Sequence, residues 1–309
     1  MTTFTIVGVG EILWDVFPTH KQLGGAPANF AYISLLLGDQ AIVATRIGND
    51  ELGDEVIGRL QALGLGTSYV QHDPRHPTGT VKVEVARDGQ PRFEIVHPVA
   101  WDFLEWTPEL ESLAKRADAI CFGSLAQRGP QSRETIHRFL NSTRKDTVRI
   151  FDVNLRQAFF SAEVLAFSAQ KADILKVNHE ELPIVVDALS GPPLDDVRSA
   201  QWLCRRFDLD LACITRGASG SILVKPSGHH EHPGYKVIVT DTVGSGDAFT
   251  ATLIHHYLRG SSLEVMNDAA NRMGAWVASK AGATPAADPA ELEKARAQPT
   301  HSTSPAPRP

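Results

Sequence analysis

The chain has 309 residues, of which 42% are hydrophobic and 21% charged, a composition typical of a globular protein in water. Its formal net charge of -6 offers no broad attraction to nucleic acid or to an anionic membrane, so we expect neither partner and a small-molecule ligand instead. Three cysteines without C-x-x-C spacing, no basic leader and no run of eighteen apolar residues predict a cytoplasmic protein without disulfides, zinc or a membrane span.

The N-terminal segment contains two predicted strands. Thr5 to Val9 is short and rich in β-branched residues, which is typical of a buried strand, and Gly8-x-Gly10 at its end resembles the start of a dinucleotide-binding motif. The third glycine of that motif would fall on Leu13, and Glu11 to Phe17 alternates like a strand instead of opening a helix. We therefore exclude that motif and place the Asp15 carboxylate on an extended segment after the first strand.

A glycine-rich turn comes next. Gly24 and Gly25 precede apolar residues at helical spacing, which predict a helix that ends at Gly38. The two glycines let a ligand approach the backbone closely, and the Asn29 amide offers both donors and an acceptor, a mixture that suits sugar hydroxyls. The same residues also fit a plain strand-to-helix turn with Asn29 exposed to solvent, and both interpretations stay open here.

The following segment contains a β-α repeat and then a hairpin. Ala41 to Ile47 predicts a strand, and an apolar stripe from Leu52 to Leu63 predicts a helix. Thr78 to Val85 and Arg92 to Val96 then alternate around the turn 87–90, which contains Asp-Gly. With the segment from Glu11 to Phe17, this hairpin is expected to form a small separate sheet that covers a site as a lid.

From Asp118 onward, short apolar strands alternate with helical stretches. The predicted strands are Ala119 to Phe122, Val148 to Val153, Ile174 to Val177 and Leu211 to Thr215. This alternation is typical of a parallel sheet covered by helices on both faces, which binds its ligands at the carboxyl ends of the strands. Polar residues gather after those ends, namely Ser124, Gln127, Arg128, Asp152, Asn154, Arg156, Asn178, Glu181, Thr215, Arg216 and Gly217.

Two of these segments allow more than one interpretation. Asn178 followed by Glu181 has the spacing of a capping box, although a helix start after a strand is also where a magnesium-phosphate group sits in this architecture. His229, His230 and His232 are expected in an exposed turn between strands instead of a metal site. At the C-terminus, Gln298 to Pro309 is rich in Pro and Ser and is expected to be a disordered tail.

The segment from Asp241 to Phe249 predicts an anion-binding corner. Glycines on both sides of Ser245, just before an apolar helical run, are expected to free three backbone N–H groups to point at one spot, where the helix dipole adds to their attraction. Asp247 in the first turn is placed to accept a proton from a hydroxyl, which suggests phosphoryl transfer to an alcohol. The alternative is a flexible turn with Asp247 as a charge that complements the helix dipole.

Together these motifs resemble the ribokinase-like carbohydrate kinases of the phosphofructokinase B type, from about Ile6 to Pro285. Asp241-Thr242-Val243-Gly244-Ser245-Gly246-Asp247-Ala248-Phe249 resembles the C-terminal signature of that family, in which alanine is commoner than Ser245. Gly24-Gly25-Ala26-Pro27-Ala28-Asn29 resembles the N-terminal signature, and Gly48-Asn49-Asp50-Glu51-Leu52-Gly53 the segment after it. The resemblance implies a three-layer α/β/α sandwich with a mostly parallel central sheet, formed by residues 1–297, with lid segments at about 11–23 and 76–104.

The resemblance also implies roles for individual residues. Asp247 becomes the general base, with an anion hole formed by Gly244, Ser245 and Gly246. The implied sugar ligands are Asp15, Gly24, Gly25 and Asn29, with Phe93 and Arg156. The implied nucleotide site comprises Asn178, Thr215, Gly217, Gly220 and Asn271, and Glu181 acts indirectly on Mg²⁺. Asp241 and Val243, with the loop 282–284, resemble a monovalent-cation site for K⁺.

Within that family, Gly10 to Pro18 and Phe151 to Arg156 look most like fructokinases. The implied reaction is transfer of the γ-phosphoryl group of ATP to D-fructose by a homodimer that pairs through its lid. Ribose, 2-keto-3-deoxygluconate and ribonucleosides suit the same scaffold, and a non-catalytic binding homologue is the alternative of a different class. A P-loop kinase is excluded because the sequence lacks G-x-x-x-x-G-K-[ST].

Overall fold

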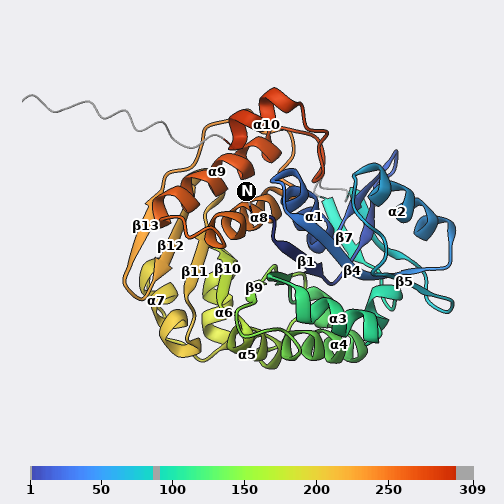
Figure 1. The fold of residues 1–309 in the computed structure, drawn as a ribbon, viewed down its shortest axis with the longest axis horizontal. Helices are drawn as coiled ribbons and strands as arrows, with labels where there is room; N and C mark the ends of the chain where they lie inside the picture. Colours follow the sequence, from blue (N-terminus) through green and yellow to red (C-terminus); the bar gives the residue numbers. More distant parts are fainter. Residues whose placement is uncertain (1, 86–90, 297–309) are drawn as a thin grey trace, which may run out of the picture.

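The computed structural model describes residues 2–85 and 91–296. Its centre is a sheet in the order β13-β12-β11-β10-β9-β8-β1-β4-β5, parallel from β11 to β5 and antiparallel at the β12 and β13 edge (Figure 1). Its strands are β1 (Thr5–Val9), β4 (Gln40–Gly48), β5 (Val70–Asp73), β8 (Ala119–Phe122), β9 (Val148–Asp152), β10 (Ile174–Asn178), β11 (Leu211–Thr215), β12 (Ser221–Lys225) and β13 (Gly228–His232). The predicted central strands and their parallel pairing are confirmed.

Helices cover both faces of this sheet and form two hydrophobic cores. One core contains Leu175 and Val177 of β10, and its helices are α3 (Pro108–Arg116), α4 (Pro130–Asn141), α5 (Ala162–Lys171), α6 (Glu181–Ala188) and α7 (Asp196–Phe207). The other contains Ile174 of β10, and its helices are α1 (Ala26–Leu36), α2 (Glu51–Ala62), α8 (Ser245–Tyr257), α9 (Leu263–Ala278) and α10 (Pro289–Arg296). Because side chains alternate along each strand, one buried strand supplies both cores. The predicted three-layer sandwich is confirmed.

A second, smaller sheet has the order β3-β2-β6-β7. Its strands are β2 (Leu13–Val16), β3 (Lys21–Gly24), β6 (Gly79–Val85) and β7 (Pro91–Ile95). The predicted hairpin is the antiparallel pair of β6 and β7, whose turn 87–90 lies outside the described residues. The strand expected from Glu11 starts only at Leu13, and β3, which the sequence interpretation missed, pairs with it. The indole N–H of Trp14 donates to the Leu52 carbonyl of α2 at 3.0 Å, which ties the small sheet to the body.

One prediction of local structure is wrong. His229, His230 and His232 lie on β13, not in a turn, and only residues 226 and 227 form the turn that precedes it. The polar sequence of this segment does not indicate a strand. It becomes one by pairing with β12, where His232 is opposite Ser221.

Three further expectations concern a membrane span, the C-terminal tail and the number of domains. No helix within residues 2–85 and 91–296 is long and apolar enough to cross a membrane. The tail expected at 298–309 lies outside the described residues. The single domain over 1–297 stays a prediction.

Candidate active site

The first turns of α1 and α8 meet at the carboxyl-terminal side of β1. The two helices pack side by side near the middle of the molecule (Figure 1), and the Asn29 amide Nδ2 donates to the Asp247 carboxylate at 2.8 Å. Asn29 is 4% exposed, so the alternative of a solvent-exposed amide does not hold. The contact joins two signatures that lie 218 residues apart in the sequence.

The backbone before α8 adopts a conformation that requires glycine. Gly244 has φ 77°, and a Cβ there would lie 2.5 Å from the Cβ of Ala283. The Ser245 N–H donates to the Thr242 carbonyl at 3.2 Å, so it does not point at a ligand as predicted. Within the described residues, the backbone N–H groups of Gly246 and Asp247 have no acceptor and no side-chain cap. The Gly244 N–H has no acceptor among the described residues either, so the corner offers three free N–H groups, with that of Asp247 in place of the expected Ser245.

The electrostatic setting of Asp247 matches the needs of a base. Burial and, after it, the Asp152 carboxylate raise the pKa of Asp247 to about 6, against the lowering effects of the Asn29 hydrogen bond, Lys176 and Arg156. At neutral pH the carboxylate is therefore mostly ionised and is more basic than an ordinary aspartate.

Glu11 is a further residue of this site, which the sequence interpretation treated only as an interruption of an apolar stretch. It is 3% exposed, and its Oε2 atom has no hydrogen-bond partner among the described residues. Burial raises the pKa of Glu11 to about 7; the nearby Asp247 also raises it, while its own backbone N–H, Arg156 and the N–H of Ala26 lower it. The signal in the sequence was its place two residues after the end of β1, at the edge where the other polar residues gather.

The predicted sugar side gathers around β2 and the start of α1. Asp15 is half-buried, and burial raises its pKa to about 6, with Arg156 lowering it and Asp241 raising it. A Cβ on Gly24 would lie 2.7 Å from the Asp15 carboxylate, and one on Gly25, which has φ 115°, would lie 2.6 Å from the Glu11 carbonyl. Packing against backbone thus requires Gly25, whereas the atoms near Gly24 are ends of side chains that can shift.

The two remaining residues predicted on this side are Arg156 and Phe93. Arg156 is exposed, and its guanidinium donates to the Leu155 carbonyl at 3.0 Å. Phe93 lies on β7 opposite Val83, and its side chain lies outside the described part of the structure.

Asn178 and Glu181 form the capping box at the start of α6. The Asn178 Oδ1 atom accepts from the backbone N–H groups of Glu180 and Glu181 at 2.9 and 2.8 Å, and Glu181 accepts in return from the Asn178 N–H at 3.1 Å. The second oxygen of Glu181 accepts from the Leu155 N–H at 2.8 Å. Both side chains therefore hold the backbone, and their nucleotide and magnesium roles stay predictions.

The predicted nucleotide loop lies between β11 and β12. Thr215 ends β11, and Gly217 and Gly220 adopt positive φ angles of 56° and 81°. A Cβ on Gly220 would lie 1.9 Å from the His232 carbonyl, so packing against β13 requires this glycine, whereas the space beside Gly217 is open. The Asn271 amide donates to the Asn267 carbonyl and to Ser221, both at 2.7 Å, which leaves only its oxygen free of these bonds.

The predicted cation site and a neighbouring cavity adjoin the small sheet. The Asp241 carboxylate accepts from the N–H groups of Val243 and Gly282 at 3.0 and 3.1 Å, which brings the two predicted segments together. A cavity of about 400 Å³ lies next to them, lined by Trp14, Lys21, Gln22, Leu23, Arg59, Ala281, Gly282, Ala283 and Thr284.

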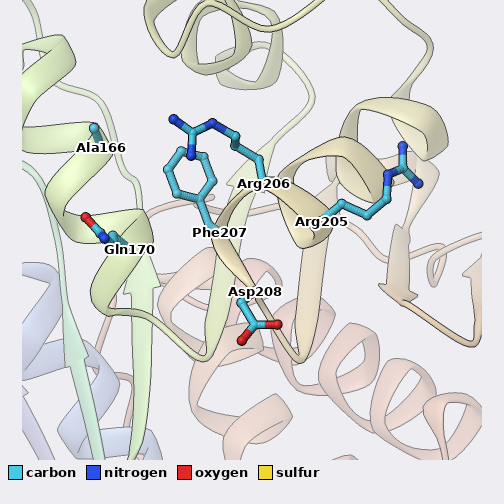
Figure 2. Close-up of a pocket in the computed structure, with 6 residues that line it drawn as sticks. All are labelled: Ala166, Gln170, Arg205, Arg206, Phe207 and Asp208. Carbon is cyan, nitrogen blue, oxygen red and sulfur yellow. The ribbon is translucent and has the colours of Figure 1, made fainter.

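Another cavity, of about 440 Å³, lies between α5 and the end of α7 (Figure 2). Phe207 ends α7 ahead of β11, so this cavity is at the amino-terminal side of the sheet, opposite the site. The Arg206 guanidinium lies over the Phe207 ring, 5.1 Å from its centre. The arginine is thus already engaged by its neighbour.

The sequence profile of the pfkB family carbohydrate kinases matches residues 9–290, nearly the whole chain. The chain belongs to this family. Its relatives include Fructokinase-1 of Oryza sativa subsp. japonica, which is 29% identical over an alignment that covers 93% of this kinase and 95% of the relative. The Fructokinase of Escherichia coli is 28% identical over 258 residues, which cover 80% and 82%.

A solved structure agrees with this membership. The crystal structure of an uncharacterized sugar kinase from Pyrococcus horikoshii in complex with ATP matches this pfkB kinase with a TM-score of 0.80 and 28% identity, over 94% of this chain and 97% of that one. The predicted ribokinase-like fold and the predicted class of activity are confirmed: the protein is an ATP-dependent sugar kinase.

Proposed function

We propose that this pfkB kinase is a fructokinase in which Asp247 is the general base. The reaction transfers the γ-phosphoryl group of ATP to the 6-hydroxyl of D-fructose and yields ADP and D-fructose 6-phosphate. The observation that carries this proposal is the Asp247 carboxylate, held by Asn29 beside the free N–H groups of Gly246 and Asp247. The carboxylate accepts the proton of the attacking hydroxyl, while the N–H groups stabilise charge on the transferred phosphoryl group.

Fructose is favoured over other sugars on two grounds. The relatives from Oryza sativa and Escherichia coli bear the name fructokinase, and Gly10 to Pro18 and Phe151 to Arg156 look most like that group. In this proposal, Asp15, Asn29 and Arg156 recognise the hydroxyls, together with the backbone at Gly24 and Gly25 and the ring of Phe93. A site that pairs a given hydroxyl rejects analogues that lack it by a large factor.

Two cations complete the proposal. Within the described residues, no group of three or more His, Cys, Asp or Glu side chains is placed to hold a metal ion, so the ATP phosphates themselves supply most Mg²⁺ ligands, with Glu181 and Asn178 acting through water. The ion would neutralise phosphate charge. For K⁺, the Asp241 carboxylate and the backbone oxygen of Val243 provide the hard oxygen donors that such an ion prefers, next to the loop 282–284.

An acceptor panel tests the substrate. ADP release is measured with magnesium ATP and fructose, ribose, 2-keto-3-deoxygluconate or ribonucleosides, each with and without potassium. We expect fructose to give the highest kcat/KM and potassium to raise it. If another acceptor exceeds fructose, the fructokinase proposal is wrong and the sugar-kinase class stands; if no acceptor releases ADP, the non-catalytic alternative replaces the proposal.

We propose further that the small sheet is a lid that closes over the sugar and pairs two copies of the chain. A four-stranded sheet has an apolar face that needs a cover, and Asp15 lies on its strand β2. Sedimentation should show a dimer, and amide exchange in β6 should slow when sugar binds. A strict monomer with equal exchange in both states would contradict the proposal.

A further inference from the structure

A buried ion pair lies beneath the first turn of α8. Lys176 of β10 and Asp152 of β9 are direct partners in the parallel register, and the Lys176 Nζ atom is 3.0 and 3.1 Å from the two carboxylate oxygens. The two residues are 7% and 3% exposed. Removing both charges from water costs several kcal/mol, which a good pair repays only in part, so such a pair is weak evidence for stability and calls for another role.

The pair contacts α8 at two points. The Thr250 hydroxyl is 2.8 Å from the second Asp152 oxygen and 3.0 Å from the Gly246 carbonyl, so it links the carboxylate to the first turn of the helix. On the same turn, a Cβ on Gly246 would lie 3.1 Å from the Lys176 Nζ atom. Gly246 belongs to α8 and has no positive φ, so a side chain there would meet this ammonium group and not a strained backbone.

The pair also acts electrostatically on the neighbouring Asp247. Asp152 raises the pKa of Asp247 and Lys176 lowers it, so the two partners oppose each other. The other groups that face this carboxylate are Glu11 after β1, Arg156 after β9 and Asn29 on α1. In turn, burial lowers the pKa of Lys176, but Asp152 and Asp247 raise it by more, so the lysine stays charged.

We propose that the Lys176–Asp152 pair is the positioning unit of the base: it holds the first turn of α8 through Thr250 and acts on the Asp247 carboxylate with two opposite charges. This inference rests on the proposed role of Asp247. Lys176 and Asp152 are positioning residues because they act through that carboxylate and through the backbone of Gly246. Lys176 belongs to none of the sequence motifs, and Asp152 entered them only as a polar residue in the segment from Phe151 to Arg156.

The first test is the pH dependence of kcat/KM. If Asp247 must be ionised, kcat/KM falls on the acid side near its pKa. Removing a like charge should move this acid limb to lower pH in Asp152→Asn, and removing an opposite charge should move it to higher pH in Lys176→Met, each by about half a pH unit or more. The acid limb of the double variant should lie between those of the two single variants, because both opposing charges are gone.

The second test isolates the link to the helix and covers the case in which a single charge variant fails to fold. Thr250→Val removes the hydroxyl and keeps both charges, so we expect kcat to fall about 10- to 100-fold through misplacement of the base, with an unmoved acid limb and nearly unchanged KM values. Thr250→Ser keeps the hydroxyl and should restore kcat.

A control pair lies at the amino-terminal ends of the same two strands, with Arg149 on β9 and Asp173 directly before β10. Arg149 and Asp173 form an ion pair of 2.7 Å there, and Arg149→Met with Asp173→Asn should leave the acid limb in place. The inference would be overturned if the acid limb of kcat/KM stayed in place in both Asp152→Asn and Lys176→Met, or moved in the same direction in both. Neither result would contradict the proposed role of Asp247. If Asp247→Asn keeps full turnover, the proposed base fails, and the inference fails with it.

Discussion

Helices α6 and α8 both begin near the carboxyl-terminal edge of the central sheet, yet their first turns are satisfied in opposite ways. At the start of α6, the Asn178 side chain accepts from the N–H groups of Glu180 and Glu181, and the Glu181 side chain accepts in return from the Asn178 N–H. In α8, Gly244 provides no side chain, and the N–H groups of Gly246 and Asp247 have no acceptor among the described residues. A capped helix start offers fewer free N–H groups to an anion than an uncapped one, so phosphate is expected at α8 first.

The largest effect is expected from a substitution of Asp247, which tests whether this residue is a base or only a charge that complements the helix dipole. Asp247→Asn should lower turnover by roughly two to four decades with little change in ATP affinity, because the carboxylate takes the proton only during transfer. The control is Asp196→Asn in the first turn of α7, which should cost no more than about 1 kcal/mol of stability and leave turnover intact. Turnover retained in Asp247→Asn would return this residue to the dipole alternative.

Near the start of a third helix, α1, lies Glu11, whose ionisation should make the stability of the protein depend on pH. Its pKa is about 7 in the folded protein against 4.5 for an ordinary glutamate, so the folded state holds more protons between these values. Stability from this group is complete below about pH 4.5 and is lost as pH rises through 7, a loss of up to about 3 kcal/mol.

Urea unfolding of the wild type and Glu11→Gln between pH 5 and 8 measures this loss. The wild type should lose stability over that range, and the variant should lose less of it. Parallel curves for the two proteins would show that Glu11 ionises normally in the folded state.

A smaller effect is expected at the capped helix start. Asn178→Ala removes the acceptor of two N–H groups and should lower the free energy of unfolding by about 1 kcal/mol. If this turn also organises magnesium and phosphate, KM for magnesium ATP should rise, while kcat stays far above that of Asp247→Asn. A loss of stability with unchanged KM would assign Asn178 to capping alone.

The smallest effect is expected from the C-terminal segment, which sets the baseline for the other variants. Deleting residues 298–309 should change neither melting temperature nor turnover, since its composition offers little to bury. A clear fall in either quantity would show that the segment docks on the folded body.

Local pattern predicted much of this architecture. Burial restricts the residue types of apolar strands such as Ile174 to Val177, and backbone conformation restricts those of the glycine-rich corners before α1 and α8. Both kinds of segment can therefore be predicted from the sequence. The polar strands β3 and β13 could not be predicted in this way, because only pairing with β2 and β12 makes them strands.

Much of the site depends on contacts between segments that are distant in the sequence. The burial of Glu11 and the position of the Lys176 ammonium group next to Gly246 follow from register and helix packing, which no local motif encodes. The same holds for the Ser245 N–H, which a turn bond to Thr242 removes from the expected anion hole. The sequence therefore predicted which residues lie together at the site more reliably than which of their atoms lack a hydrogen-bond partner.

The bond between Asn29 and Asp247 also has a consequence for synthesis on the ribosome. The two residues are 218 positions apart, and at about 5 to 20 residues per second roughly 10 to 45 seconds separate their translation. During that time the Asn29 amide and the buried Glu11 lack the helix that completes their surroundings. A nascent or truncated chain without α8 therefore exposes half of the proposed catalytic centre, and we expect activity only after α8 has been translated.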